Sequence, residues 1–412
     1  MKTLLAGIAK DFGTPCYVYD IDKLKSRATD TRAAFASHFK LSYAVKANPN
    51  LSLLVQMKNS VDMLDISSGG ELKRTMATQW DPEKISFTGP AKTDTELYES
   101  VEARIGEIIL ESVNEAERLS AIAARAGVVQ PVLLRISPIR IPAGFGSTMA
   151  GRPTPFGIDE EVAESALDQI RGMKSLRVKG FHIYAGTQCL KADSIVENLE
   201  SCMRLFRKLC EKADFVPEKL IFGSGLGIPY HLGDEPLDIN AIGNAINPQL
   251  KAFRESGRFA NTDLVLELGR YLIGEAGYYL MRVLNIKKSR GATLCICDGG
   301  MHHHLAASGH LGSVIPRNYQ MFKTGADTDS DANLQPYELC GPLCTSIDRI
   351  GRAVKLPNLC VGDVIAIKSS GAYGITASPM HFISHAPPKE IMFERVDERW
   401  KVEDISELKM PV

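Results

Sequence analysis

The stretch 41–47, LSYAVKA, is the part of the sequence that best indicates the fold. It is a short apolar run of strand character that reaches Lys46, and a helix-like segment follows it. Seven similar runs follow along the chain, at 61–66, 84–88, 105–110, 131–136, 179–184, 219–222 and 264–268. Eight strand–helix alternations over about 230 residues predict an α/β fold with a (β/α)8 barrel, although a doubly wound sheet would give a similar count.

Charged and flexible residues collect at the carboxyl ends of these predicted strands. Barrel enzymes carry their active sites on that face, so the pattern indicates a site there. The residues are Lys46, Asp65, Arg135, His182, Tyr184, Glu267, Gly269, Arg270 and the glycine-rich segment 223–227, GSGLG.

Lys46 lies in an otherwise apolar strand, where a buried ammonium is costly. Desolvation favours the neutral amine, which is the form that attacks an aldehyde. A lysine that only reaches solvent from the strand end is an equally good interpretation of this residue alone.

The glycine segment, Glu267 and Arg135 can each be interpreted either as part of a binding site or as a purely structural feature. Backbone N–H groups around Gly225 can approach a phosphate closely, although tight turns also use glycine. A carboxylate at Glu267 can face a pyridine nitrogen and keep it protonated, or it can form a structural ion pair with Arg270. Arg135 can likewise do no more than pair with a carboxylate of the barrel.

The pattern changes after about residue 275, where strand-like runs continue without helices between them. They lie at 278–286, 293–297, 364–368, 380–383 and 391–396, and 15–19 near the N-terminus also has strand character. We therefore predict a barrel domain at 25–275 and an antiparallel β domain made of 1–24 and 276–412. The polar stretch 323–333 predicts an exposed loop.

The composition is that of an ordinary globular protein, with 44% hydrophobic residues and a formal net charge of −1. It excludes a chain-wide attraction to nucleic acid or anionic membranes. No apolar run approaches the roughly 20 residues that span a bilayer, and the N-terminus lacks the features of a signal peptide. Nine scattered cysteines, an odd number, argue against a disulfide framework and predict a cytoplasmic protein.

The run His302-His303-His304, with His310 nearby, invites comparison with a metal site. Adjacent side chains point in different directions, and no spaced ligand set accompanies the run, so we predict no metal. Contact with substrate, or a place on the surface, is the preferred interpretation. Two further segments, 340–348 and 370–374, place Cys344 as a possible proton donor and Tyr373 as a possible phosphate contact.

Five motifs in this order resemble one family, the fold-type III pyridoxal-phosphate decarboxylases, to which diaminopimelate and ornithine decarboxylases belong. They are 43–48 (YAVKAN), 223–230 (GSGLGIPY), 267–270 (ELGR), 341–344 (GPLC) and 371–374 (GAYG). The resemblance covers nearly the whole chain. It implies the barrel with a C-terminal β domain, pyridoxal 5'-phosphate as cofactor, and a homodimer with shared active sites.

The resemblance also implies a role for each residue. Lys46 would form the Schiff base with the cofactor, Glu267 would pair with the pyridine nitrogen, and Cys344 of the partner chain would return a proton. The cofactor-binding set is Lys46, Asp65, Arg135, His182, Tyr184, Ser224, Gly225, Gly227, Glu267, Gly269, Arg270 and Tyr373. The substrate set is Arg152, Asp298, His302, His303 and Thr345.

Three departures from the family bear on the substrate. Family members place a histidine against the cofactor ring at the position of Tyr184, while His182 here lies two residues earlier on the same strand face. Diaminopimelate decarboxylases carry an arginine where this chain has Ala306 and an acidic residue where it has Thr345. These differences disfavour free diaminopimelate.

Residues 148–158 (TMAGRPTPFGI) are more similar to a subgroup that acts on larger substrates. Those substrates are siderophore precursors, such as citryl-diamino-acid conjugates, and amino acids tethered to carrier proteins. Arg152 and the histidines would then face an anionic substrate arm.

Three alternatives remain beside this function. The first is meso-diaminopimelate decarboxylase of lysine biosynthesis. The second is an amino-acid racemase on the same barrel, a class that lacks the Gly-Pro-x-Cys motif found here at 341–344. The third is a cofactor-binding regulator, a class that usually lacks the β domain, the lysine or the cysteine.

Overall fold

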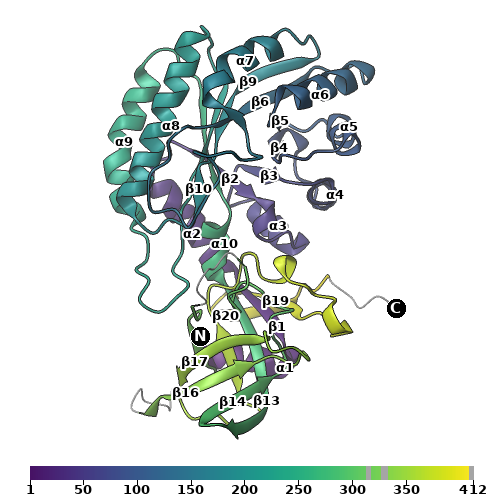
Figure 1. The fold of residues 1–412 in the computed structure, drawn as a ribbon, viewed down its shortest axis with the longest axis vertical. Helices are drawn as coiled ribbons and strands as arrows, with labels where there is room; N and C mark the ends of the chain where they lie inside the picture. Colours follow the sequence, from purple (N-terminus) through teal and green to yellow (C-terminus); the bar gives the residue numbers. More distant parts are fainter. Residues whose placement is uncertain (312–316, 326–332, 408–412) are drawn as a thin grey trace. The chain divides into compact units, whose positions relative to one another are not determined.

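The computed structural model describes residues 1–311, 317–325 and 333–407, which form two compact units (Figure 1). The barrel unit comprises Ser26–Gly227 and Pro236–Gly269. The β unit comprises Met1–Lys25, Ile228–Glu235 and Arg270–Val412. Ile228–Glu235 thus groups with the β unit although it falls inside the range predicted for the barrel.

The barrel unit contains a closed ring of eight parallel strands, which confirms the predicted barrel and excludes the open sheet. In ring order the strands are β5 (Glu107–Leu110), β4 (Ile85–Phe87), β3 (Met63–Ile66), β2 (Lys40–Ala44), β12 (Asp263–Leu268), β11 (Lys219–Gly223), β9 (Leu176–Ile183) and β6 (Gln130–Ser137). Pairing of β5 with β6 closes the ring, and the short strand β8 (Ile158–Asp159) pairs in parallel with the end of β6.

Helices cover the outside of this ring. They are α2 (Ile21–Ala34), α3 (Leu51–Met57), α4 (Gly69–Ala77), α5 (Asp94–Glu102), α6 (Val113–Arg125), α7 (Ala163–Arg171), α8 (Ala192–Lys212) and α9 (Ile239–Glu255). Figure 1 shows α8 and α9 side by side along one flank of the barrel. Inside the ring, inward-facing side chains form an apolar cluster of Met63, Ile109, Leu133, Ile221 and Val265. The barrel is therefore a packed core whose site lies beyond the strand ends.

The floor of the barrel holds a charged cluster that the sequence did not reveal. Glu107, at the start of β5, is fully buried and lies 2.6 Å from Lys219 and 3.0 Å from Lys179. Burial lowers the pKa of Lys219, so its charge depends on this carboxylate.

Replacing Glu107 with glutamine is expected to lower the free energy of unfolding by about 3–5 kcal/mol, because two lysines lose their counter-charge inside the barrel. Urea denaturation measures this. Lys40→Ala is the matched control, since it breaks the exposed pair with Asp263 and should cost under about 1 kcal/mol. Equal effects of the two substitutions would contradict the assigned role of the cluster.

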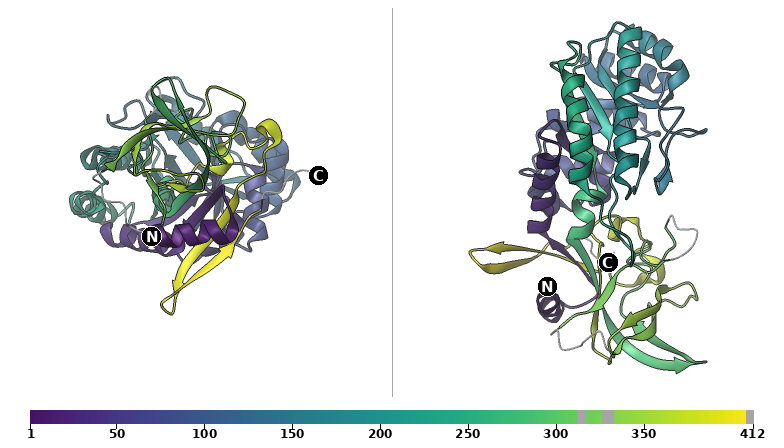
Figure 2. Two further views of the ribbon diagram at one scale, coloured as in Figure 1. Left: turned by 90° about the horizontal axis from the view of Figure 1, so that it is seen from below. Right: turned by 90° about the vertical axis from the view of Figure 1, so that its left-hand side faces the viewer.

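The β unit is a mixed sheet of nine strands, of which most neighbours are antiparallel. Its strands are β1 (Cys16–Asp20), β13 (Gly277–Ser289), β14 (Ala292–Cys297), β15 (Met321–Lys323), β16 (Gln335–Cys340), β17 (Arg349–Leu356), β18 (Val364–Ile367), β19 (Lys389–Val396) and β20 (Arg399–Asp404). The N-terminal strand β1 joins it, as predicted, pairing antiparallel with β13 and parallel with β19. Figure 2 shows the β19–β20 hairpin, in yellow, projecting from the sheet.

One prediction about the β unit was wrong. Residues 380–383 do not form a strand but lead into a short 3-10 turn, Phe382–Ser384, where Ile383 takes a left-handed φ of +58° that no strand allows. The N-terminus also forms a helix, α1 (Lys2–Phe12), whose Leu5 and Ile8 are buried against Val18 and Phe393. The predicted loop 323–333 lies mostly outside the described residues, since 326–332 are not among them.

No helix within the described ranges combines the length and apolar character that crossing a bilayer requires. All nine cysteines are free thiols.

Candidate active site

Lys46 follows β2 directly, but it lies in a 3-10 turn, Val45–Ala47, and not in the strand as predicted. Its side chain is 39% exposed, and its Nζ lies 3.9 Å from Oε1 of Glu267. The same Nζ lies 5.7 Å from the centre of the Tyr184 ring. The turn therefore lifts the amine out of the barrel core into the space above the strand ends, beside a carboxylate and an aromatic ring.

Glu267, near the end of β12, is buried and held by His182 from β9. The two side chains are 3.0 Å apart, between Oε2 and the histidine Nε2. Burial would raise the pKa of Glu267, but the hydrogen bond from His182 and the charge of Lys46 outweigh it and lower that pKa. Burial lowers the pKa of His182, which favours the neutral imidazole, whose Nε2–H can donate to Glu267. Its Nδ1 is buried without a partner among the described residues.

Asp65, in β3, is a buried carboxylate with one oxygen satisfied. Its Oδ1 accepts from Ser86 at 3.0 Å and from Thr88 at 2.5 Å, while Oδ2 has no partner among the residues described. Burial and then repulsion from Glu267 raise the pKa of Asp65 to about 8. The site therefore holds one carboxylate that is ionised and one that binds a proton readily.

Arg135, in β6, is buried and paired with Glu111, a residue that the sequence did not single out. Their nitrogen and oxygen are 2.9 Å apart. The guanidinium also lies over the Phe156 ring, 4.7 Å from its centre, and Glu111 accepts from the Gly157 N–H at 2.6 Å. Arg135 therefore does pair with a carboxylate of the barrel, as one of its two interpretations expected. The pair also anchors the end of the loop 138–157, which carries Arg152. Arg152 itself is exposed.

At the glycines after β11 and at Gly269, a residue with a side chain would collide with neighbouring atoms or strain the backbone. Gly225 has a left-handed φ of +67°, and a Cβ there would collide with the ring of Phe145. A Cβ on Gly227 would meet the Cys189 carbonyl oxygen at 2.8 Å, and the Ser224 N–H is bound to the Glu267 carbonyl at 3.3 Å. A Cβ on Gly269 would press on Ala47 at 3.3 Å. The glycines therefore let Phe145, the Cys189 backbone and Ala47 pack directly against the backbone next to Lys46 and Glu267.

These observations fit a cofactor with an aldehyde, a ring nitrogen and a phosphate. Lys46 provides an amine, and Glu267 keeps Oε1 for a second contact because His182 binds Oε2. Two buried polar atoms, Oδ2 of Asp65 and Nδ1 of His182, have no partner among the described residues. Such orphaned atoms are costly unless a ligand satisfies them, which marks this end of the barrel as a binding site.

Arg270 and Tyr373 meet in the β unit. The Arg270 guanidinium lies 4.8 Å from the centre of the Tyr373 ring and donates to the Tyr230 hydroxyl at 2.5 Å. Burial would lower the pKa of Arg270, but Tyr230 and Tyr373 outweigh it and raise that pKa. Nε of Arg270 has no partner among the described residues, so a donor is left for an anion. Tyr230 lay inside a predicted motif but was not singled out.

Cys344 is exposed in a turn that Asp348 organises. Asp348 is buried, and its carboxylate accepts from the Leu343 N–H at 2.9 Å and from the Met301 N–H at 2.7 Å. This carboxylate ties the turn of Cys344 and half-buried Thr345 to the start of the histidine run. Sequence reasoning missed Asp348 because both of its partners are backbone groups.

Asp298 and the histidine run are bound within their own unit. Asp298 accepts from the Thr14 hydroxyl at 2.5 Å and from the Arg282 N–H at 2.7 Å. His302, His303 and His304 are buried, so the surface interpretation of the run was wrong, while the nearby His310 is exposed. Among the described residues no cluster of three histidine, cysteine or acidic side chains is arranged to hold a metal ion.

The buried histidines predict an acid-sensitive unit. Burial lowers the pKa of His302 to about 4, and those of His303 and His304 to about 3. An unfolded histidine titrates near 6.5, so between about pH 6.5 and pH 4 the unfolded chain binds protons that the folded chain excludes.

The free energy of unfolding is therefore expected to fall as pH drops from about 6.5 to about 4, by up to ~1.4 kcal/mol per pH unit for each histidine. Urea titrations at pH 7, 6 and 5 measure the slope. His304→Gln should flatten it, because one titrating group is removed. A slope that His304→Gln leaves unchanged would show that this histidine is not buried in its neutral form.

Comparisons with known proteins agree with this geometry. The family model described as pyridoxal-dependent decarboxylase, pyridoxal binding domain, matches residues 21–274. The chain is 35% identical over 392 residues to L-glutamyl-[BtrI acyl-carrier protein] decarboxylase of Niallia circulans, covering 94% of this chain and 90% of that protein.

It is 28% identical over 385 residues to 2-[(L-alanin-3-ylcarbamoyl)methyl]-2-hydroxybutanedioate decarboxylase of Staphylococcus aureus, covering 93% and 94% of the two chains. Among solved structures, the diaminopimelate decarboxylase of M. jannaschii in co-complex with L-lysine superposes with a TM-score of 0.85 at 25% identity. That match covers 98% of this chain and 91% of the other.

Proposed function

Because this chain belongs to the pyridoxal-dependent decarboxylases, we propose that it removes the α-carboxylate of an amino acid whose side chain is joined to a carrier protein. It is a pyridoxal-phosphate enzyme, a carboxy-lyase that acts on an amino acid or an amino-acid conjugate. The main support for the tethered substrate is the 35% identity, over 94% of the chain, to a protein named for an L-glutamyl group on an acyl-carrier protein. The α-amine and the α-carboxylate must both be free to react, so the tether would run through the side-chain carboxyl.

The cofactor would be held at the open end of the barrel. Lys46 would bind its aldehyde carbon, Glu267 its ring nitrogen, and the backbone around Gly225 its phosphate. When bound, pyridoxal phosphate supplies an electron-withdrawing ring that accepts the electron pair left by departing carbon dioxide.

The protein's own residues set the charges around that group. Glu267 stays ionised because His182 donates to it, and a carboxylate at this place favours a protonated ring nitrogen. Asp65, with its raised pKa, can hold a proton near the Lys46 amine. Cys344 would supply the proton that replaces the carboxylate on the α-carbon.

We place Cys344 and Asp298 in the active site of a second copy, so that a homodimer would share its sites. The exposure of Cys344 supports this, because an exposed thiol can face another chain. The nine free thiols also agree with a reducing, cytoplasmic setting.

A second substrate class has some support. The Staphylococcus relative is named for a conjugate of 2-hydroxybutanedioate, a carboxylate-rich arm, and exposed Arg152 could face such an arm. Free diaminopimelate is disfavoured by Ala306 and Thr345, where diaminopimelate decarboxylases carry charged residues.

A panel of three substrates tests the proposed function: a side-chain-linked L-glutamyl carrier thioester, a citryl-diamino-acid conjugate and meso-diaminopimelate. Carbon dioxide release should be fastest, by at least about tenfold in kcat/KM, with the carrier thioester. Preference for diaminopimelate, or stereoinversion without carbon dioxide release, would contradict the proposal.

A further inference from the structure

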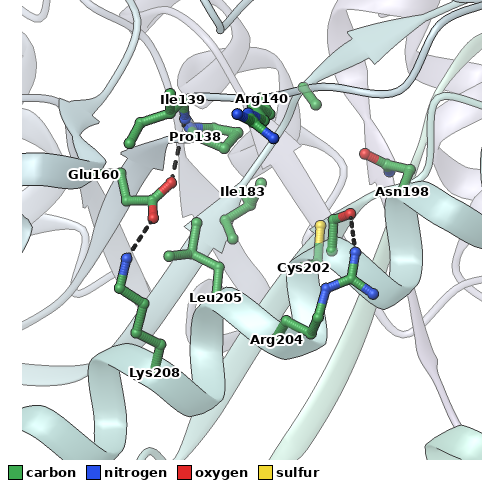
Figure 3. A pocket seen from close by; sticks show the side chains of 12 residues that line it. Pro138, Ile139, Arg140, Glu160, Ile183, Asn198, Cys202, Arg204, Leu205 and Lys208 are labelled. Carbon is green, nitrogen blue, oxygen red and sulfur yellow. Dashed lines mark hydrogen bonds and ion pairs between the residues drawn. The ribbon is translucent and has the colours of Figure 1, made fainter.

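A cavity of about 450 Å³ lies between the loop after β6, the end of β9 and the side of α8 that carries the buried residues Asn198, Cys202 and Leu205 (Figure 3). None of the residues named so far for cofactor or chemistry lines it. It is lined by Pro138, Ile139 and Arg140 from the loop, Ile183 at the end of β9, Ala185 just after it, Glu160, and Asn198, Ser201, Cys202, Arg204, Leu205 and Lys208 from α8.

The cavity has an apolar floor and a cationic rim. Ile183, Ala185 and Cys202 are buried side chains of the floor. The lining holds three cations, Arg140, Arg204 and Lys208, and one carboxylate, Glu160. The combination of a short apolar channel and positive charge suits a ligand that is amphipathic and ends in an anion.

The three cations differ in how far they are already neutralised. Lys208 lies 2.7 Å from Glu160, whose other oxygen accepts from the Ile139 N–H at 3.2 Å, as Figure 3 shows. Arg204 donates to Ser201 at 2.7 Å and lies 3.6 Å from Glu200. Among the described residues no carboxylate pairs with Arg140. An anion in the cavity would therefore gain most from Arg140.

Two connections link the cavity to the proposed cofactor site. Ile183 and Ala185 line the cavity, while their chain neighbours His182 and Tyr184 contact Glu267 and Lys46 of the candidate active site. The second connection is Asn198, 2% exposed, whose side-chain N–H donates to the Gly223 carbonyl at 3.3 Å. Gly223 begins the glycine segment. The Tyr184 ring packs so closely on Gly223 that a Cβ there would collide with it.

We propose that this cavity binds the phosphopantetheine arm of the carrier-tethered substrate, with the phosphodiester at Arg140 and Arg204 and the pantetheine chain along the apolar floor. The inference rests on the proposed function and assigns the site that binds the arm linking the substrate to its carrier. Arginine forks suit phosphate oxygens, and the methylene and dimethyl groups of pantetheine suit Ile183 and Leu205. A citryl arm has several carboxylates but no apolar length, so it would leave the floor uncovered.

The test compares one aminoacyl group on three arms: phosphopantetheine, pantetheine without the phosphate, and a short N-acetylcysteamine thioester. With the native holoenzyme, kcat/KM for carbon dioxide release should be at least about tenfold higher on phosphopantetheine than on pantetheine, the usual scale of a charge-assisted contact. Arg140→Glu should bring that ratio close to one. Lys212→Glu, the same charge change on α8 outside the cavity, should keep the native ratio.

Binding of phosphopantetheine itself, measured by calorimetry with the native protein and Arg140→Glu, separates this inference from the proposed function. Binding that Arg140→Glu weakens about tenfold supports the cavity site, even if no thioester is decarboxylated and the proposed function fails. Carbon dioxide release from the short thioester without phosphopantetheine binding would overturn the cavity site alone. Equal binding of the carrier with and without its arm, or full competition by inorganic phosphate at equal concentration, would also overturn it.

Discussion

Lys46→Ala is expected to abolish decarboxylation. It should lower kcat by roughly 10⁴-fold or more, the usual loss when an enzyme is deprived of its covalent nucleophile. The cofactor would lose its covalent link, while Glu267 would lose a cation 3.9 Å from its carboxylate. The visible absorbance of the protein with added pyridoxal phosphate should shift to that of the free aldehyde.

Lys73→Ala is the matched control, because this lysine is exposed and pairs at the surface with Glu99. It should keep both the absorbance and the activity. Native absorbance and measurable carbon dioxide release in Lys46→Ala would show that another residue holds the cofactor.

Cys344→Ala is expected to lower kcat by about 10²–10⁴-fold, the usual contribution of a positioned acid, with cofactor absorbance unchanged. The thiol is exposed, and its proposed role is in protonation alone, so we expect kcat to fall while KM changes little. Cys360→Ala is the control, since Cys360 is also exposed and lies outside every predicted motif.

Mixing Lys46→Ala with Cys344→Ala subunits tests whether the sites are shared. Random pairing makes half of the dimers mixed, and each mixed dimer has one complete site, so about a quarter of the native activity should return. Mixtures that stay inactive after subunit exchange would contradict a shared site.

The barrel could be predicted from the sequence because each strand is a short apolar run that a helix follows. Local pattern was enough to fix the strands, and the closed ring then placed Lys46, Asp65, His182 and Glu267 at one end. The strand carrying Lys46 was drawn too long, because apolar character does not distinguish a strand from the 3-10 turn at Val45–Ala47.

The β unit was harder to predict. Strands such as β16 and β20 contain proline or many charged residues, QPYELC and RWKVED, and lie partly exposed, so they lack a clear alternating pattern. Residues 380–383 are apolar enough for a strand, but positive φ at Ile383 excludes one.

The site residues that the sequence missed are those whose role depends on distant partners. Glu111 matters because it meets Arg135 and the Gly157 backbone, and Asp348 because it joins the turns of Leu343 and Met301. Glu111 lies in no segment singled out from the sequence, and Asp348 ends the segment 340–348 without a role assigned to it there. The burial of the histidine run likewise follows from tertiary packing. It could not be predicted from the sequence, because three polar residues in a row are typical of an exposed segment.

Mass spectrometry of a loaded carrier protein tests the central claim most directly. A carrier bearing a side-chain-linked L-glutamyl group, incubated with the native holoenzyme, should lose the mass of one carbon dioxide and remain attached. The Lys46→Ala protein should leave the carrier mass unchanged. An unchanged carrier mass with native enzyme that decarboxylates an untethered amino acid would contradict the claim.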